Sequence, residues 1–104
     1  MTRQAIREMK RAVRAGGPGA SDGSQAIAKD CALSLLNRSI TFGHRRLAVI
    51  RLAMAVRAGA EIPVACWVYC RDAVEASKNP LLQGLYLTAA TEFSTRPAGP
   101  TKGN

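Results

Sequence analysis

The chain has few aromatic residues and few acidic residues, and both shortages limit what it can be. Aromatic residues make up 5% of the 104 positions, so the interior must be built from Ala, Leu, Val and Ile. Asp and Glu number 7 against 15 Lys and Arg, which gives a formal charge of +8 at pH 7. Such a charge favours a negatively charged partner, which can be nucleic acid, an anionic membrane surface or an acidic protein.

The sequence is also poor in groups that carry out catalysis. Its single histidine, His44, has no acidic residue beside it, and no paired carboxylates or nucleophile motif occur. The glycine-rich segment 16–24 lacks the lysine that a phosphate-binding loop requires. We therefore expect a protein that is not an enzyme and that uses no cofactor.

Cysteine spacing and the short apolar runs bear on metal binding and on the membrane. Cys31, Cys66 and Cys70 with His44 would supply four zinc ligands, but Cys66 and Cys70 lie four residues apart on an apolar stripe, which favours core packing and no metal. No apolar run approaches the about 20 residues of a membrane span. The N-terminus lacks the apolar centre of a secretory signal. With three unpaired cysteines, these features predict a cytoplasmic protein.

The sharpest pattern is a run of cations at the start of the chain. At the three- and four-residue spacings of a helix, they gather on one side, while Ile6, Met9 and Val13 take another. The pattern predicts an amphipathic helix over residues 2–15, capped by Thr2. Its candidate binding residues are Arg3, Arg7, Lys10, Arg11 and Arg14. The alternative is a solvated surface that only keeps a basic protein soluble.

A second basic block covers residues 43–60, which contain four arginines and no acid. Arg45 and Arg46 fall at the predicted start of a helix, where the helix dipole disfavours cations. A bound anion such as phosphate would compensate for this placement, since the first-turn N–H groups and two guanidinium groups suit it. The alternative is that both side chains simply extend into water.

Glycine and proline divide the chain into about five helices, which predicts an all-α fold. We expect a single helical domain over residues 1–93, with a Gly-rich loop at 16–24 and a helical core at 25–93, followed by a disordered tail at 94–104. The expected core helices cover residues 25–38, 44–58, 63–77 and 79–93. Residues 64–70 also have strand propensity, but their apolar residues share one helical stripe, which favours a helix.

The helix over residues 44–58 is apolar on two sides, so we expect it at the centre of the bundle, buried between its neighbours. Replacing Ile50 with alanine should then carry the full cost of a core deletion. The aromatic residues Phe42, Trp67, Tyr69, Tyr86 and Phe93 also fit the core, which disfavours base stacking as a binding mode.

These patterns predict a non-enzymatic nucleic-acid-binding accessory protein that contacts the phosphate backbone through its basic helix face, with Arg45 and Arg46 as a second clamp. The alternative is a protein-interaction module or inhibitor that docks its basic face on an acidic partner protein. A third possibility is a homodimer completed by the exposed first helix.

Overall fold

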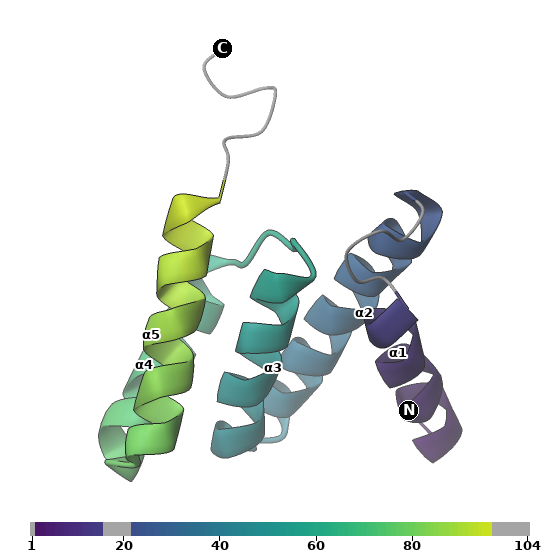
Figure 1. Cartoon of the computed structure of the whole chain (residues 1–104). Coiled ribbons are helices and arrows are strands. Elements are labelled where there is room, and N and C mark those ends of the chain that lie inside the picture. The colour runs from purple at the N-terminus through teal and green to yellow at the C-terminus, as the bar shows by residue number, and fades with distance from the viewer. Residues whose placement is uncertain (1, 16–21, 97–104) are drawn as a thin grey trace.

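The protein is all-α, as the sequence predicts. The computed structural model describes residues 2–15 and 22–96, and these ranges hold five helices and no strand: α1 (Arg3–Ala15), α2 (Asp22–Thr41), α3 (Arg45–Arg57), α4 (Val64–Ser77) and α5 (Pro80–Thr95) (Figure 1). Residues 64–70 therefore begin a helix and are not a strand. Residues 16–21 of the predicted loop and 97–104 of the predicted tail lie outside the described residues.

Several helix ends form as their sequences predict. The Thr2 hydroxyl oxygen accepts a hydrogen bond from the N–H of Ala5 at 3.0 Å, and the Asn79 side-chain oxygen accepts one from the N–H of Leu81 at 2.9 Å. Gly59 ends α3 in the left-handed conformation, with φ +87°. These contacts satisfy backbone groups that a helix end leaves without partners.

Helix α2 is longer than predicted at both ends. Residues 22–24, expected in a loop, form its first turn, where polar residues are tolerated because the first N–H groups need no partner within the helix. Residues 39–41, expected in a turn, continue the helix because Ser39 is fully buried and its hydroxyl donates to the Leu35 carbonyl oxygen at 3.1 Å. The hydroxyl is thereby satisfied inside the core, and the helix extends to Thr41.

The helices form a slab of 39 × 38 × 20 Å. Figure 1 shows α2 and α3 side by side, with α1 on one side of this pair and the α4–α5 pair on the other. Among the described residues, α1 contacts no helix other than α2, whereas α3 contacts α2, α4 and α5. The N-terminal ends of α1 and α3 lie at the lower end of the view in Figure 1, as does the C-terminal end of α2.

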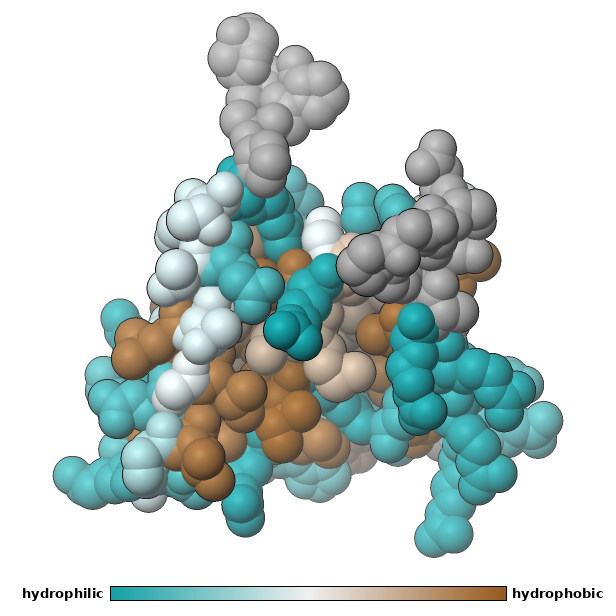
Figure 2. All heavy atoms as spheres, viewed as in Figure 1, coloured by the Kyte–Doolittle hydropathy of each residue, from teal (hydrophilic) through white to brown (hydrophobic). Residues whose placement is uncertain are grey.

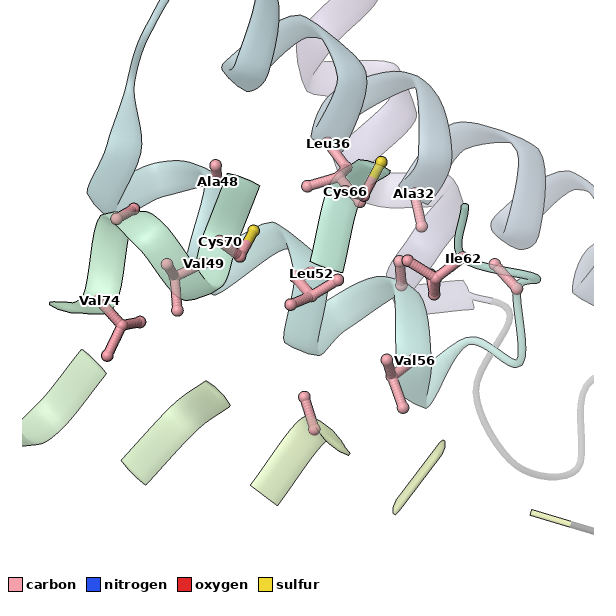
Figure 3. Close-up of a cluster of buried hydrophobic side chains, with 14 of the residues drawn as sticks. Ala32, Leu36, Ala48, Val49, Leu52, Val56, Ile62, Cys66, Cys70 and Val74 are labelled. Atoms are coloured by element: carbon pink, nitrogen blue, oxygen red, sulfur yellow. The ribbon is translucent and has the colours of Figure 1, made fainter. Parts of the chain in front are cut away.

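The core lies between α2, α3 and α4 and is closed by α5 (Figure 3). Its largest fully buried apolar side chains are Leu35, Leu36, Val49 and Leu52. Buried alanines on α2, α3 and α4 keep the helix backbones close together. The interior is thus made of Ala, Leu and Val, with Ile62, Cys66 and Cys70, and this agrees with the shortage of aromatic residues.

Burial of α3 on all sides is not confirmed. The stripe containing Val49, Leu52 and Val56 is buried, but Ile50 on the other predicted stripe is 41% exposed. Ile50 lines an open groove between α3 and α5, and α1, which packs on α2, does not cover it. The predicted loss of stability for Ile50→Ala, which assumed a fully buried side chain, is therefore too large.

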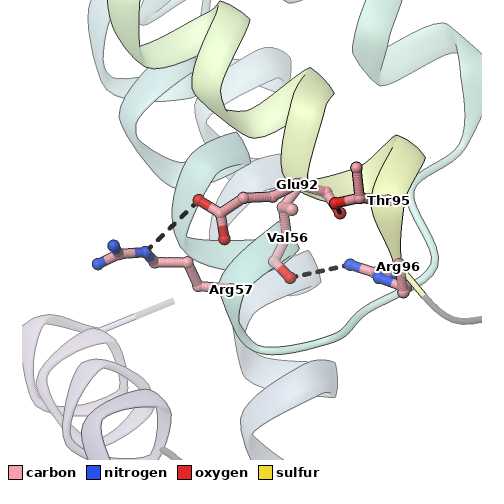
Figure 4. A network of polar contacts seen from close by, with 5 residues as sticks. All are labelled: Val56, Arg57, Glu92, Thr95 and Arg96. Atoms are coloured by element: carbon pink, nitrogen blue, oxygen red, sulfur yellow. Dashed lines mark hydrogen bonds and ion pairs between the residues drawn. The ribbon is translucent and has the colours of Figure 1, made fainter.

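The last turn of α5 is also more ordered than its sequence indicates. Ser94 and Thr95 remain helical, and Arg96 donates to the carbonyl oxygen of Val56 (Figure 4) and to that of Ala60, both at 2.8 Å. The prediction of a disordered tail from residue 94 is wrong for residues 94–96. One arginine fork ties the end of α5 to the end of α3 and to the following loop, because a planar guanidinium can donate to two carbonyl groups at once.

Candidate functional site

The five cations of α1 are all exposed and lie on one side of the helix. We call Arg3, Arg7, Lys10, Arg11 and Arg14 the α1 cluster. The Thr2 cap starts the helix, and Ile6, Met9 and Val13 on its apolar side are partly buried, in a helix that packs on α2. The docking of this side on α2 directs the cluster away from the core. Figure 2 shows hydrophilic side chains extending from this part of the molecule.

No acid neutralises the α1 cluster within the part of the chain that the structure describes. The two ion pairs found there join Arg57 to Glu92 and Arg71 to Asp72, both at 3.8 Å. Glu8 lines a shallow hollow beside Arg3, Arg7 and Arg11 but makes no ion pair. The cluster thus keeps its charge available for an external anion.

Arg45 and Arg46 are also exposed, at the start of α3. No side chain caps this helix, and its first turn contains no acid. The two arginines line an open hollow with Gly43, His44 and Leu47, at the helix end where the dipole is positive. Arg45 also borders a second hollow that contains Tyr69 and Asp72. The predicted clamp is therefore solvent-accessible, and one acidic residue, Asp72, lines a hollow together with Arg45.

The predicted basic residues form two groups and not one continuous site. Helix α2 lies between α1 and α3, and α1 makes no contact with α3 among the described residues. The N-terminal ends of α1 and α3 nevertheless lie at the same end of the molecule (Figure 1). A ligand that contacts both groups must extend across the end of α2.

The sequence prediction missed two residues beside this second group. Phe42, predicted in the core, is 59% exposed in the turn between α2 and α3. The Arg38 guanidinium lies 4.9 Å from the centre of the Phe42 ring, and the His44 ring lies 6.3 Å from it at an interplanar angle of 30°. The available signal was Gly43, since a glycine here commonly ends a helix and places the preceding Phe42 at the helix end and not within a buried stripe.

Another arginine near this turn, Arg51, is buried and has a structural role. Arg51 is 7% exposed and donates to the Leu35 carbonyl oxygen at 3.1 Å and to the Ser39 hydroxyl oxygen at 3.0 Å. Burial, and next the charge of Arg38, lower the pKa of Arg51 from its ordinary value. The side chain stays cationic, because an arginine does not lose its proton in a protein. Its acceptors lie near the C-terminal end of α2, where the helix dipole is negative.

Two of the three cysteines are core residues in this structure, and Cys31 is partly buried. Cys66 and Cys70 are buried on one side of α4, and burial raises the pKa of both thiols, that of Cys70 to about 12. Such thiols stay neutral at physiological pH and are poor nucleophiles and metal ligands. Across the described ranges, no group of three or more His, Cys, Asp or Glu side chains is placed to hold a metal ion.

A larger hollow than those beside the basic residues lies between α3 and α5. It has a volume of about 600 Å³ and a mostly apolar lining that includes Ile50, Met54, Leu81 and Leu85. Arg57 and Glu92 border it and form an exposed ion pair, seen in Figure 4. Figure 2 shows apolar side chains gathered over these two helices. None of the seven predicted binding residues, which are the α1 cluster with Arg45 and Arg46, lines this groove.

Comparison with known proteins gives no relative: no protein-family model, no curated protein and no solved structure matches the chain. None of the helices in residues 2–15 and 22–96 has both the length and the apolar character needed to cross a membrane. The function must therefore be inferred from the geometry alone.

Proposed function

We propose that the protein is a non-enzymatic accessory protein that binds the phosphate backbone of nucleic acid. The α1 cluster makes the main contact, and Arg45 and Arg46 make a second one. The observation that carries the proposal is that all seven side chains are exposed and make no ion pair with an acid among the described residues. Unpaired surface cations favour a polyanion because binding releases its condensed counterions.

The dimensions of α1 fit a phosphate backbone. At a rise of 1.5 Å per residue, the eleven steps from Arg3 to Arg14 span about 16 Å. Successive phosphates of one strand of a duplex are spaced by about 3.4 Å along its axis. Because the strand also winds around the duplex, a straight helix contacts only part of this stretch, and a few phosphate contacts are enough for salt-dependent binding.

A membrane surface fits the same charge less well. An interfacial helix must insert its apolar side into the lipid boundary. In this protein Ile6, Met9 and Val13 are partly buried in a helix that packs on α2. The same packing within one chain removes the reason for completing a homodimer through α1. An acidic protein partner remains the alternative, and the following experiment separates it from nucleic acid.

The test is a salt-titrated binding assay with a labelled generic duplex. We expect affinity to fall steeply between about 50 and 200 mM salt. The Arg7→Glu/Lys10→Glu variant should bind more weakly, and its salt slope should be smaller by about one for each phosphate that it no longer touches. The charge-matched control is Lys29→Glu/Lys78→Glu, which changes two exposed lysines that make no ion pair among the described residues and lie outside the α1 cluster.

The control variant undergoes the same change in net charge, so weaker binding confined to the α1 variant assigns the contact to that helix. Equally weak binding by both folded variants would mean that only the net charge matters. No binding of nucleic acid by the wild-type protein at low salt, together with charge-dependent binding to an acidic protein, would contradict the proposal and favour the alternative.

A further inference from the structure

We propose that Phe42 is a base-stacking platform and that the ligand is single-stranded or otherwise unpaired nucleic acid. This inference rests on the proposed function and specifies its ligand. The observation that carries it is an exposed aromatic ring held among cations: Phe42 is 59% exposed, with Arg38 and His44 against its ring and Arg45 and Arg46 following in the chain.

The backbone of the turn fixes the position of Phe42. Its N–H donates to the Arg38 carbonyl oxygen at 3.1 Å and so continues the α2 pattern for one residue. The next two N–H groups close the end of the helix, from Gly43 to Ile40 at 3.1 Å and from His44 to Ser39 at 2.8 Å. Gly43 has φ +71°, which a glycine adopts without strain. The ring is therefore presented by an ordered helix end.

The exposure of this ring contrasts with the other aromatic side chains. Trp67 packs against Tyr86 and Phe93, with ring centres 5.8 Å and 5.3 Å apart. Within the described residues, Phe42 has no such aromatic partner beyond His44, and its main neighbour is the Arg38 guanidinium. An exposed phenylalanine gives up the stabilisation that burial of its ring would provide, and its free ring surface suits a partner with a flat apolar face.

A nucleobase supplies that face, and the surrounding charges fit the rest of a nucleotide. Arg38 holds the ring by a cation–π contact, and a base can stack on the ring surface that remains exposed. Arg45 and Arg46, in the next two positions after His44, are then available for the attached phosphates. Aromatic stacking combined with a positively charged track is the usual basis for binding single strands.

A duplex and an apolar protein surface fit this site less well. The bases of a duplex are stacked on one another, so a duplex offers its phosphates but no free base face to Phe42. An apolar protein surface that covered Phe42 would also bury the guanidinium of Arg38, and burying an unpaired charge is unfavourable. The α1 cluster makes no such distinction, since phosphates are present on single strands and duplexes alike.

The experiment compares two probes, an oligothymidylate of about 12 nucleotides and a mixed-sequence duplex of the same length, by fluorescence anisotropy at low salt. The Phe42→Leu variant keeps an apolar side chain but loses the ring. We expect it to bind the single strand about 5- to 100-fold more weakly, in line with the loss of one stacked base, and to leave duplex binding unchanged. Phe42→Trp should retain binding because the indole also stacks. Leu87→Ala, which trims an exposed apolar residue on α5, is the matched control and should bind like the wild type.

A second readout reports stacking directly. The emission of the exposed indole in Phe42→Trp should be quenched by the oligothymidylate, after subtraction of the Trp67 signal that the wild-type protein provides. Val64→Trp places an exposed indole at the start of α4 and should show no such quenching. Circular dichroism of each variant verifies that the helices are intact.

Failure of this inference differs from failure of the proposed function. If the wild type binds the single strand and Phe42→Leu binds it equally well, the stacking platform is wrong, while backbone binding stands. If Phe42→Leu weakens single-strand and duplex binding by the same factor, the ring contacts a duplex and the assignment of an unpaired ligand is wrong. If the wild type binds neither probe at low salt, the proposed function itself is overturned.

Discussion

At the scale of single residues, the arginines divide into two kinds that composition alone does not separate. Most are exposed, but Arg51 and Arg96 donate to main-chain carbonyl oxygens inside the fold. In both cases the acceptors include carbonyl groups near the C-terminal end of a helix, where the dipole attracts a cation. Counting these two among the surface charges overstates the charge available to a ligand.

The contrast between Leu52 and Ile50 gives a residue-scale prediction. Leu52 is fully buried, so Leu52→Ala should lower the free energy of unfolding by about 2–5 kcal/mol. Ile50 is 41% exposed, and Ile50→Ala should cost about 1 kcal/mol or less. Urea unfolding followed by circular dichroism measures both values. An equal cost for the two variants would mean that Ile50 is covered in solution, for example by a second chain.

At the scale of helices, α2 and α3 are joined by a polar link as well as by apolar packing. Arg51 of α3 donates to Ser39 and Leu35 of α2, and Ser39 donates to the same Leu35 carbonyl oxygen. All three groups lie in the buried interface, and none of the buried side-chain polar atoms among the described residues lacks a partner. Removing Ser39 or Arg51 therefore takes one of its buried hydrogen-bond partners from the other.

This link predicts a coupling between Ser39 and Arg51. Ser39→Ala should lower the free energy of unfolding by about 1–3 kcal/mol, because Arg51 loses a buried acceptor. In the Arg51→Met background the same change should cost at least about 1 kcal/mol less, because the donor is gone. A double-mutant cycle measured by urea unfolding tests this. Identical costs in the two backgrounds would show that the hydrogen bond does not hold the helices together.

The sequence was sufficient to predict the helices and several of their ends, because the relevant signals are local. Thr2, Gly59 and the Asn79–Pro80 pair act within one helical turn. The end of α2 was missed because Ser39 is buried in the core, where it also accepts from Arg51, twelve residues later in the chain. The end of α5 was missed for the same reason, since Arg96 bonds to Val56 and Ala60. A local reading cannot find such contacts.

The candidate site was predicted in part. Helical spacing alone places the five cations of α1 on one side, and the structure shows all of them exposed. The sequence could not show that Phe42 lies outside the core, because apolar residues are usually assigned to the interior until the packing is known. Nor could it show that α2 separates the two basic groups, which is a property of the topology.

At the scale of the whole molecule, the contacts are unevenly distributed along the slab. Helix α1 is attached through α2 alone among the described helices, whereas α3 contacts three other helices. The core therefore does not depend on α1 in the way that it depends on α3. The helix that carries most of the proposed ligand contacts is the one with the fewest neighbours.

This arrangement predicts a gradient of protection against amide hydrogen exchange. Backbone amides in the middle of α1 should exchange faster than those in the middle of α3, because α1 can open without disturbing the core. Mass spectrometry of exchanged peptides measures the difference. Addition of a nucleic-acid ligand at low salt should slow exchange in α1. Equal protection of α1 and α3 in the free protein would show that the five helices open as one unit.

The link between Arg51 and the last turn of α2 has a consequence for the speed of binding. It lies next to the turn that carries Phe42, Arg45 and Arg46, and it holds that turn in place before any ligand arrives. An encounter with a polyanion then requires no prior folding step at this end of the molecule. Association would be governed by diffusion and by long-range attraction between charges, and the lifetime of the complex by the contacts made afterwards.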